Sequence, residues 1–253
     1  MRLAHSIVGP QDASALVLLH GITESSGSWD PIVERLRATY RVVTVDLRGH
    51  GESPLGEAYD PVSYATDVVE TVASAGIERP VVIGHSLGGV VASAVAAISP
   101  VGGVINVDQP LRLSGFKDSL TQLEPMLRGS DAEFRQAIDM VFLMMEGPLA
   151  DPERTRIRSL RHPTQSVVLG TWESVFTSTP EELDATVGAL AGAIHVPYLS
   201  LHGIDPGPEY SPWLTSLLPT ATVETWGEQG HYPHLIDPAR FVARVDSFVA
   251  SLP

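Results

Sequence analysis

Ser86 lies in the stretch Gly84-His85-Ser86-Leu87-Gly88, which follows an apolar run and precedes a second apolar segment. The pattern Gly-x-Ser-x-Gly between a strand and a helix is typical of a sharp turn that lifts a serine hydroxyl above the sheet. There the hydroxyl could attack a carbonyl carbon, and the Leu87 N–H at the helix start could face the developing oxyanion. A turn serine can also be an ordinary capping residue, so a catalytic role requires a base.

His231 is the best candidate for that base. It follows Gly230 after an apolar run that begins at Ala221, and it precedes the last helical segment, which Asp237-Pro238 begins. The remaining histidines lie in the serine turn, at strand ends, in other turns, or without a motif around them: His5, His20, His50, His85, His162, His195, His202 and His234. No pair has metal-ligand spacing with matching carboxylates, so neither a metal nor another cofactor is expected.

The elements that must position these residues alternate along the chain. Six continuous apolar runs predict strands, and they begin at Ala15, Tyr40, Pro80, Gly102, Val196 and Ala221. Continuous rather than alternating runs indicate strands that are buried on both faces of a parallel sheet. Helical segments separate most of the runs; one begins at Asp60-Pro61 and has Tyr64, Val68 and Val72 on one face. The predicted fold class is α/β, with a doubly wound, mostly parallel sheet.

One long segment interrupts this alternation. Residues 111–194 contain no convincing strand run and instead form several helix-like stretches, which proline and glycine separate. An insertion of this size between two core strands suggests a lid or cap. We therefore expect a core of residues 1–110 and 195–253 and a helical cap of residues 111–194, packed on the core.

Composition narrows the classes of partner. Of 253 residues 43% are apolar, which allows a sizeable core, and the chain has no cysteine, which excludes disulfides and thiol nucleophiles. The formal net charge of −14 disfavours nucleic acid and anionic lipid as partners. No apolar run has the length of a membrane span, and the first residues lack the pattern of a signal peptide. A cytoplasmic protein, monomeric or homodimeric, is expected.

Four segments resemble successive landmarks of the α/β-hydrolase superfamily: LLHGITESSGSWDPIVERL, VVTVDLRGHGES, VVIGHSLGGVVA and GHYPHLIDPARFVARVDSFV. They occur in the family's order and cover nearly the whole chain outside the insertion. The resemblance implies that Ser86 is the nucleophile and His231 the base. His20-Gly21-Ile22 matches the family's oxyanion loop, which implies the Ile22 N–H as a second donor beside Leu87. The insertion matches the family's cap.

The resemblance leaves two candidates for the acid that supports the histidine. The family's usual position follows the strand that here ends in LSLHG, in the form Gly-x-x-Asp, whereas this chain has Gly203-Ile204-Asp205, one residue short. A minority of the family takes the acid from the end of an earlier strand, where this chain has INVDQP and Asp108. Asp205 is favoured, Asp108 is the alternative, and Glu209 is a weaker third option.

The expected chemistry is acyl transfer to water through an acyl-enzyme on Ser86. A serine rather than an aspartate at the turn argues against epoxide hydrolase and haloalkane dehalogenase chemistry, since both need a carboxylate nucleophile. We expect a carboxylesterase or lactonase. Rival hypotheses are a cofactor-free C–C bond hydrolase or lyase on the same triad, perhydrolysis as a side activity, and a small-molecule sensor with this fold.

Apolar side chains of the cap suggest a substrate that is small, apolar and carbonyl-containing. The cap has an apolar stripe of Met140, Val141, Leu143, Met144 and Met145, which could line a pocket or simply pack the cap on the core. Four aromatic residues are further candidates for the pocket wall or the core: Trp29, Trp172, Phe176 and Trp213.

Overall fold

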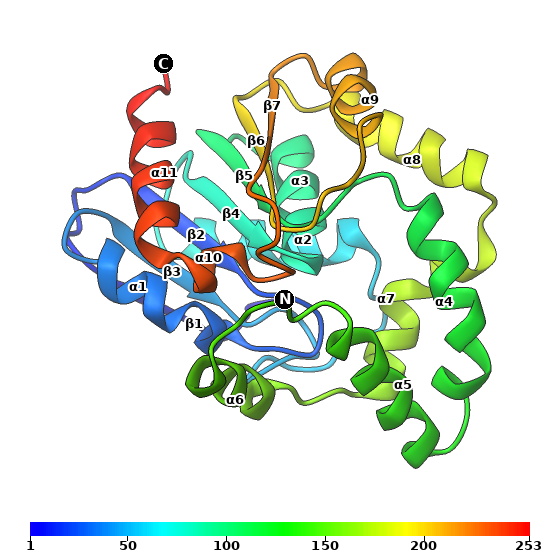
Figure 1. Cartoon of the computed structure of the whole chain (residues 1–253). Helices are drawn as coiled ribbons and strands as arrows, with labels where there is room; N and C mark the ends of the chain where they lie inside the picture. The colour runs from blue at the N-terminus through cyan, green and yellow to red at the C-terminus, as the bar shows by residue number, and fades with distance from the viewer.

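A seven-stranded sheet forms the centre of the molecule, which a computed structural model describes over residues 1–253 (Figure 1). Its strand order is β1-β3-β2-β4-β5-β6-β7, and every neighbouring pair is parallel except β1 with β3. The strands are β1 (His5–Val8), β2 (Ala15–Leu19), β3 (Arg41–Val45), β4 (Val81–His85), β5 (Gly103–Val107), β6 (Tyr198–His202) and β7 (Ala221–Thr225). The predicted α/β fold class with a mostly parallel sheet is confirmed.

Six of the seven strands coincide with the apolar runs of the sequence, and β1 is the one that the sequence analysis missed. Its four residues are two polar ones followed by two apolar ones, His5-Ser6-Ile7-Val8, and none of them is buried. It forms an antiparallel edge, with His5 opposite Val45. An edge strand pairs with only one neighbour and does not need apolar side chains on both faces. Its sequence therefore lacks the apolar run that predicts a buried strand.

Helices cover both faces of the sheet (Figure 1). They are η1 (Ser26–Trp29), α1 (Asp30–Leu36), α2 (Pro61–Ser74), α3 (Leu87–Ile98), α4 (Ser114–Leu127), α5 (Asp131–Leu143), α6 (Asp151–Leu160), α7 (Gln165–Thr177), α8 (Pro180–Gly192), α9 (Tyr210–Leu217), α10 (Pro233–Ile236) and α11 (Pro238–Ala250). Helices α2 and α3 pack together on one face, and α1 and α11 pack together on the other. No helix is both long and apolar enough to cross a membrane.

Successive residues of the central strands enter two separate apolar cores, as expected for a sheet covered on both sides. Val17 and Leu19 of β2 belong to the core beneath α2 and α3, whereas Leu16 and Leu18 belong to the core beneath α1 and α11. Trp29 is fully buried in the second core, against Phe241 and His234. Trp29 is therefore a packing residue.

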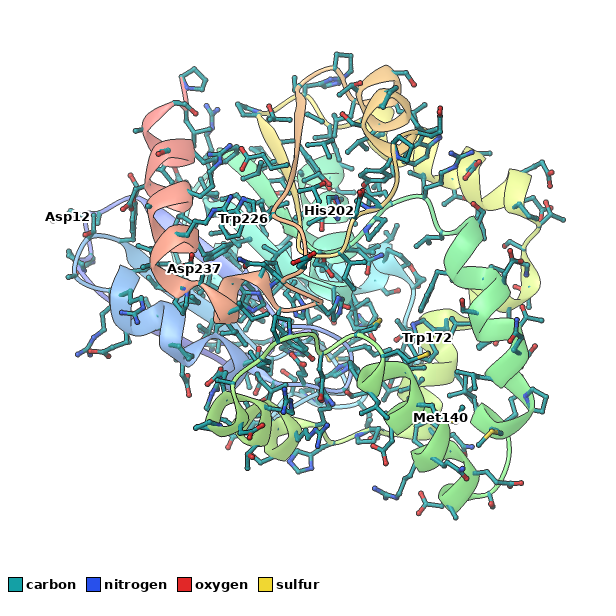
Figure 2. All side chains as sticks on the ribbon, in the orientation of Figure 1. Asp12, Met140, Trp172, His202, Trp226 and Asp237 are labelled. Carbon is teal, nitrogen blue, oxygen red and sulfur yellow. The ribbon has the colours of Figure 1, made fainter.

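Residues 111–194 contain only helices, α4 to α8, between β5 and β6. These helices lie beside the core at the carboxyl ends of the strands (Figure 1). The apolar stripe of α5 divides by exposure: Val141 is buried, whereas Met140 on the outer face is 42% exposed (Figure 2). Trp172 of α7 is only 7% exposed and lies between the insertion and the core (Figure 2). Most of the stripe therefore faces solvent.

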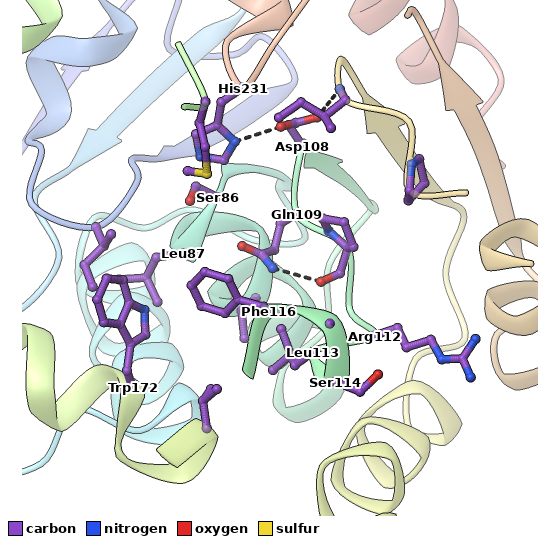
Figure 3. Close-up of a pocket in the computed structure, with 18 of the residues that line it drawn as sticks. Ser86, Leu87, Asp108, Gln109, Arg112, Leu113, Ser114, Phe116, Trp172 and His231 are labelled. Carbon is purple, nitrogen blue, oxygen red and sulfur yellow. Dashed lines mark hydrogen bonds and ion pairs between the residues drawn. The ribbon is translucent and has the colours of Figure 1, made fainter. Parts of the chain in front are cut away.

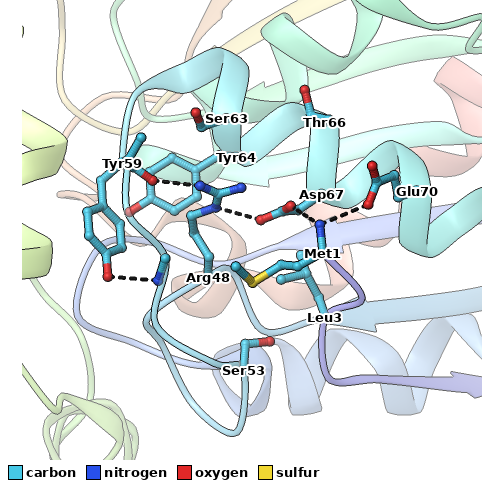
Figure 4. A network of polar contacts seen from close by, with 12 residues as sticks. Met1, Leu3, Arg48, Ser53, Tyr59, Ser63, Tyr64, Thr66, Asp67 and Glu70 are labelled. Carbon is cyan, nitrogen blue, oxygen red and sulfur yellow. Dashed lines mark hydrogen bonds and ion pairs between the residues drawn. The ribbon is translucent and has the colours of Figure 1, made fainter.

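Polar contacts fix the start of α2 and the loop before it. Asp60 caps the helix by accepting hydrogen bonds from the N–H groups of Val62 and Ser63, as its position before Pro61 predicts. The fully buried Asp67 pairs with Arg48, which also donates to the carbonyl oxygen of Ala58 at 2.7 Å (Figure 4). A buried carboxylate needs such a partner, since an unpaired buried charge is strongly destabilising.

Candidate active site

Ser86 occupies a strained turn between β4 and α3. Its φ of 53° and ψ of −123° lie in a region that residues with a side chain rarely adopt. The turn is held from both sides, since the Ser86 N–H donates to Val107 at 3.0 Å and the Gly89 N–H donates back to Ser86 at 2.7 Å. The serine is thus fixed at the carboxyl end of the sheet, at the amino end of a helix.

Glycines on either side of Ser86 allow this turn. A Cβ atom at Gly84 would overlap the carbonyl oxygen of Gly88, and one at Gly88 would overlap the carbonyl oxygen of Leu19. Strand, turn and helix therefore approach each other at backbone distance. This close approach is the physical reason for the Gly-x-Ser-x-Gly pattern in this chain.

His231 and Asp108 form a buried pair beside Ser86 (Figure 3). The Nδ1–H of His231 donates to Oδ2 of Asp108 at 2.7 Å, and both side chains are nearly inaccessible. Because Nδ1 carries the hydrogen, Nε2 has a free lone pair, and no protein group hydrogen-bonds to it. In Figure 3 Ser86 lies directly below this ring. The arrangement can take a proton from the serine hydroxyl.

The structure pairs His231 with Asp108 and not with Asp205, which the sequence analysis favoured, and this preference is corrected. Asp205 is exposed, and its carboxylate accepts a hydrogen bond from the Gly207 N–H at 2.9 Å. The short loop after β6 supplies backbone donors instead of a carboxylate. The N–H groups of Gly203 and Ile204 donate to Oδ1 of Asp108 at 2.7 and 3.0 Å. Glu209, the third option, is also exposed and has no hydrogen bond to the histidine.

The backbone of His231 is held by two segments that are distant in the sequence. Its N–H donates to the carbonyl oxygen of Met145, in the turn after α5, at 2.8 Å. Its carbonyl oxygen accepts from Nε2–H of His85 at 2.7 Å, and the rings of His85 and His231 lie 4.5 Å apart. His85, the residue before the serine, therefore helps to fix the backbone of His231.

Two backbone N–H groups near Ser86 have no acceptor in the protein, those of Ile22 and Leu87. Both residues line the same cavity as Ser86. His20 shapes the loop before Ile22: its Nδ1–H donates to the carbonyl oxygen of Gly21 at 2.7 Å, and its Nε2 accepts from the Leu47 N–H at 2.9 Å. The two free donors can stabilise an oxyanion beside the serine.

A cavity of about 640 Å³ lies above Ser86, between the core and the insertion. From the insertion it receives mainly apolar side chains, those of Leu113, Phe116, Val141, Phe142, Met145, Trp172 and Val175. The predicted pocket residues Val141, Met145 and Trp172 thus line it, whereas Leu143 and Met144 are exposed. Its volume and lining suit a small organic molecule that is largely apolar.

A buried polar chain behind the base was not found from the sequence. The Tyr232 hydroxyl donates to Oε1 of Glu24 at 2.6 Å and accepts from Arg161 at 2.9 Å. Arg161 also pairs with Glu146, in the same turn as Met145. Burial raises the pKa of the Glu24 carboxyl. These residues lie far apart in the sequence, so no local pattern could have brought them together.

Acid is expected to destabilise the fold, because five histidines are buried in neutral form. Burial lowers the pKa of His50 and His234 to about 3 and of His202 to about 4, and it also lowers the pKa values of His20 and His85. A lowered native pKa stabilises the fold above the unfolded value of 6.5, and this stability is lost as the pH falls below 6.5. Protonation of His50, His202 and His234 should therefore lower the free energy of unfolding at pH 5.5 by about 4 kcal/mol in total, relative to pH 7.5. Urea unfolding at the two pH values measures the difference.

A single histidine variant tests the cause of this acid sensitivity. Replacing His234 by Gln should reduce the difference in the free energy of unfolding between the two pH values by about 1.4 kcal/mol, the contribution of one buried histidine. His162 is exposed, so His162→Gln is the matched control and should leave the difference unchanged. Glu24 acts in the opposite direction, because its raised pKa favours the fold at low pH. Equal stability of the unmodified protein at pH 7.5 and 5.5 would contradict the prediction.

Several known proteins with similar sequences or structures are named as hydrolases. The chain is 27% identical over 238 residues to Epoxide hydrolase 4 of Mus musculus, covering 90% of this chain and 63% of that protein. It is 30% identical over 266 residues to a pimeloyl-[acyl-carrier protein] methyl ester esterase of Aeromonas salmonicida, covering 92% and 94% of the two chains. The crystal structure of the esterase RhEst1 from Rhodococcus aligns with a TM-score of 0.75 and 26% identity, covering 98% and 94%.

The chain spans less than two-thirds of the length of several curated relatives that it matches, 63% in the case of the mouse protein. A family model described as the alpha/beta hydrolase family matches residues 16–245, nearly the whole chain. This match includes the strained serine turn, the histidine loop and the segment between them. The chain therefore belongs to the alpha/beta hydrolase family.

Proposed function

We propose that this protein is a serine hydrolase that cleaves a carboxylic ester or a lactone of a small apolar molecule. The observation that carries the proposal is the His231–Asp108 pair, whose free Nε2 lies beside the strained Ser86. Ile22 and Leu87, whose N–H groups are unpaired, line the same cavity. Relatives named as esterases support the ester chemistry. A serine at this turn does not form the alkyl-ester intermediate that epoxide hydrolysis through a carboxylate requires.

The proposed reaction has two halves that share one oxyanion site. His231 takes the proton of Ser86 while the serine oxygen attacks the carbonyl carbon, and the N–H groups of Ile22 and Leu87 stabilise the oxyanion. His231 then protonates the leaving alcohol as the acyl–oxygen bond breaks. In the second half it takes a proton from water as the water oxygen attacks the acyl-enzyme, and it returns this proton to the Ser86 oxygen as the acyl–serine bond breaks and the acid is released. Asp108 keeps the histidine in the tautomer that accepts the proton.

We further propose that helices α4 to α8 act as a cap that excludes water from the reacting carbonyl. Their apolar residues form the wall opposite Ser86, where a dry surface strengthens the interactions of the oxyanion. The same wall favours apolar acyl or alcohol groups over charged ones. The hydrogen bond from His231 to Met145 links this cap to the base.

Covalent labelling combined with turnover tests the proposed function. A fluorophosphonate probe should label the protein once, with the mass added to the peptide that contains Ser86. p-Nitrophenyl esters of short acids and simple γ-lactones should be hydrolysed with steady turnover. Labelling without turnover of any ester or lactone would instead favour the sensor hypothesis, and absence of labelling at Ser86 would contradict the proposed nucleophile.

A further inference from the structure

Gln109 is the residue directly after Asp108, and its side chain lies against the first turn of α3, which follows Ser86. A Cβ atom placed on Gly89, in the first turn of α3, would be 3.0 Å from Cβ of Gln109. Gln109 also lines the cavity (Figure 3). The side chain is thus close to the reacting centre, although the proposed reaction gives it no role.

The orientation of the Gln109 amide follows from its hydrogen bond. Nε2–H donates to the carbonyl oxygen of Pro110 at 2.8 Å, and a carbonyl oxygen can accept only from the nitrogen. The amide oxygen must therefore point the other way, and Figure 3 shows it turned toward the side of the cavity with Ser86 and Phe116. The main chain is fixed as well, since Asn106 donates to the Gln109 carbonyl oxygen at 2.8 Å. No protein donor bonds to Oε1.

Most other polar groups of the cavity are already engaged or lie at its exposed mouth. The Thr171 hydroxyl donates to Val167, and the Tyr59 and Tyr210 hydroxyls accept from backbone N–H groups. Arg112, Asp205 and Glu209 are exposed. Around Gln109 the wall is apolar, with Leu113 and Phe116 beside it (Figure 3). Oε1 of Gln109 is therefore an unpaired acceptor in an apolar setting near the reacting carbonyl.

We propose that Oε1 of Gln109 accepts a hydrogen bond from the substrate, so that the preferred substrates are esters or lactones with an N–H or O–H donor within a few bonds of the scissile carbonyl. The proposal rests on the serine hydrolase function proposed above. A pocket with a hydrogen-bond acceptor for the substrate discriminates against analogues that lack the matching donor. When such an analogue binds, the acceptor loses its hydrogen bond to water and gains no new partner. An apolar wall enlarges that difference.

Two pairs of p-nitrophenyl esters isolate the donor from size and shape. In the first pair, N-acetylglycinate and levulinate differ by an amide N–H in place of a CH₂ group. In the second pair, 3-hydroxybutanoate and 3-methylbutanoate differ by a hydroxyl in place of a methyl group. The unmodified protein should prefer the donor ester in at least one pair by about five- to tenfold in kcat/KM. Preference in the first pair alone identifies an N–H donor, and preference in the second alone an O–H donor.

The variant Gln109→Met removes the amide while retaining an unbranched side chain of similar length. The preference should then fall to about one, while kcat/KM for the ester without the donor should change by less than about threefold. Gln165→Met is the matched control, since the Gln165 amide also donates to backbone carbonyl oxygens but lies outside the cavity. This control should retain the full preference.

Turnover without preference in either pair would overturn the role of Gln109 and leave the serine hydrolase function intact. A Gln109→Met variant that keeps the preference would overturn it too. An equal loss on both members of a pair, accompanied by a lower Tm, would show that Gln109 is only structural. Absence of turnover on every ester, with no labelling of Ser86, would remove the proposed function and this inference with it.

Discussion

Replacing Ser86 by alanine is expected to reduce kcat on any ester that the protein hydrolyses by about 10⁶-fold. The expectation is this large because serine and base act as one unit, so that loss of either removes the covalent route entirely. Residual hydrolysis would come from the two unpaired N–H groups, those of Ile22 and Leu87, which polarise a bound carbonyl without a nucleophile. The measurement is steady-state turnover of a p-nitrophenyl ester, together with fluorophosphonate labelling, which should disappear.

The matched control for this variant is Ser93→Ala in the same helix. The Ser93 hydroxyl is buried and donates to the Gly89 carbonyl oxygen at 2.8 Å, so its loss perturbs α3 without removing the proposed nucleophile. The hydroxyl also bonds the Tyr198 hydroxyl at 2.9 Å, so the variant loses two neutral hydrogen bonds, each worth about 1 kcal/mol of stability. Activity should nevertheless remain within about tenfold of the unmodified protein, because neither bond involves the proposed nucleophile. A Ser86→Ala variant that retains full turnover would show that another residue is the nucleophile.

The serine turn and the sheet around it could be predicted from the sequence because the signals are local. Six strands lie on the runs that the sequence marks as strands, and the turn between β4 and α3 is a five-residue pattern with the required glycines. Each signal acts over fewer than ten residues, where periodicity and backbone sterics determine the conformation. The exposed edge strand β1 lacks any such signal and was missed for that reason.

The aspartate that pairs with His231 could not be identified in the same way, because two loops end next to each other at one edge of the sheet. Strands β5 and β6 are neighbours, so Asp108 and Asp205 both follow strands that end near His231. The choice depends on the side-chain direction in each loop. Asp108 has a φ of 51°, and its backbone N–H donates to Leu201 at 2.7 Å. This backbone conformation is rare outside glycine, and neighbouring sequence does not predict it.

The contacts that hold His231 in place could not be predicted from the sequence either. His231 receives its backbone partners from Met145 and His85, and neither residue has a motif that points to the histidine. The buried pair of Glu24 and Tyr232 joins segments from opposite ends of the chain. Such tertiary contacts arise only when the sheet and the insertion are assembled, so the sequence predicts the serine turn and the histidine loop better than the contacts that support them.

Replacing Asp108 by asparagine is expected to reduce kcat by about 10³- to 10⁴-fold. Asparagine can still accept from Gly203 and Ile204 through its oxygen, so the loop after β6 should keep its conformation. Its NH₂ group would then face Nδ1 of His231 as a donor, which favours the tautomer with hydrogen on Nε2. That tautomer has no lone pair directed at Ser86, so the base is lost although its geometry is kept.

Asp205→Asn is the matched comparison, because it makes the same chemical change in the neighbouring loop. The asparagine oxygen can keep the hydrogen bond from the Gly207 N–H, and the side chain is exposed, so kcat should change by less than about tenfold. Circular dichroism and Tm measured on both variants separate a loss of folding from a loss of chemistry. The carboxylate that acts through His231 is the one whose replacement by asparagine reduces kcat by the larger factor. We expect this residue to be Asp108. A larger loss of kcat in Asp205→Asn would contradict the prediction and would mean that the loop after β6 rearranges to supply the acid.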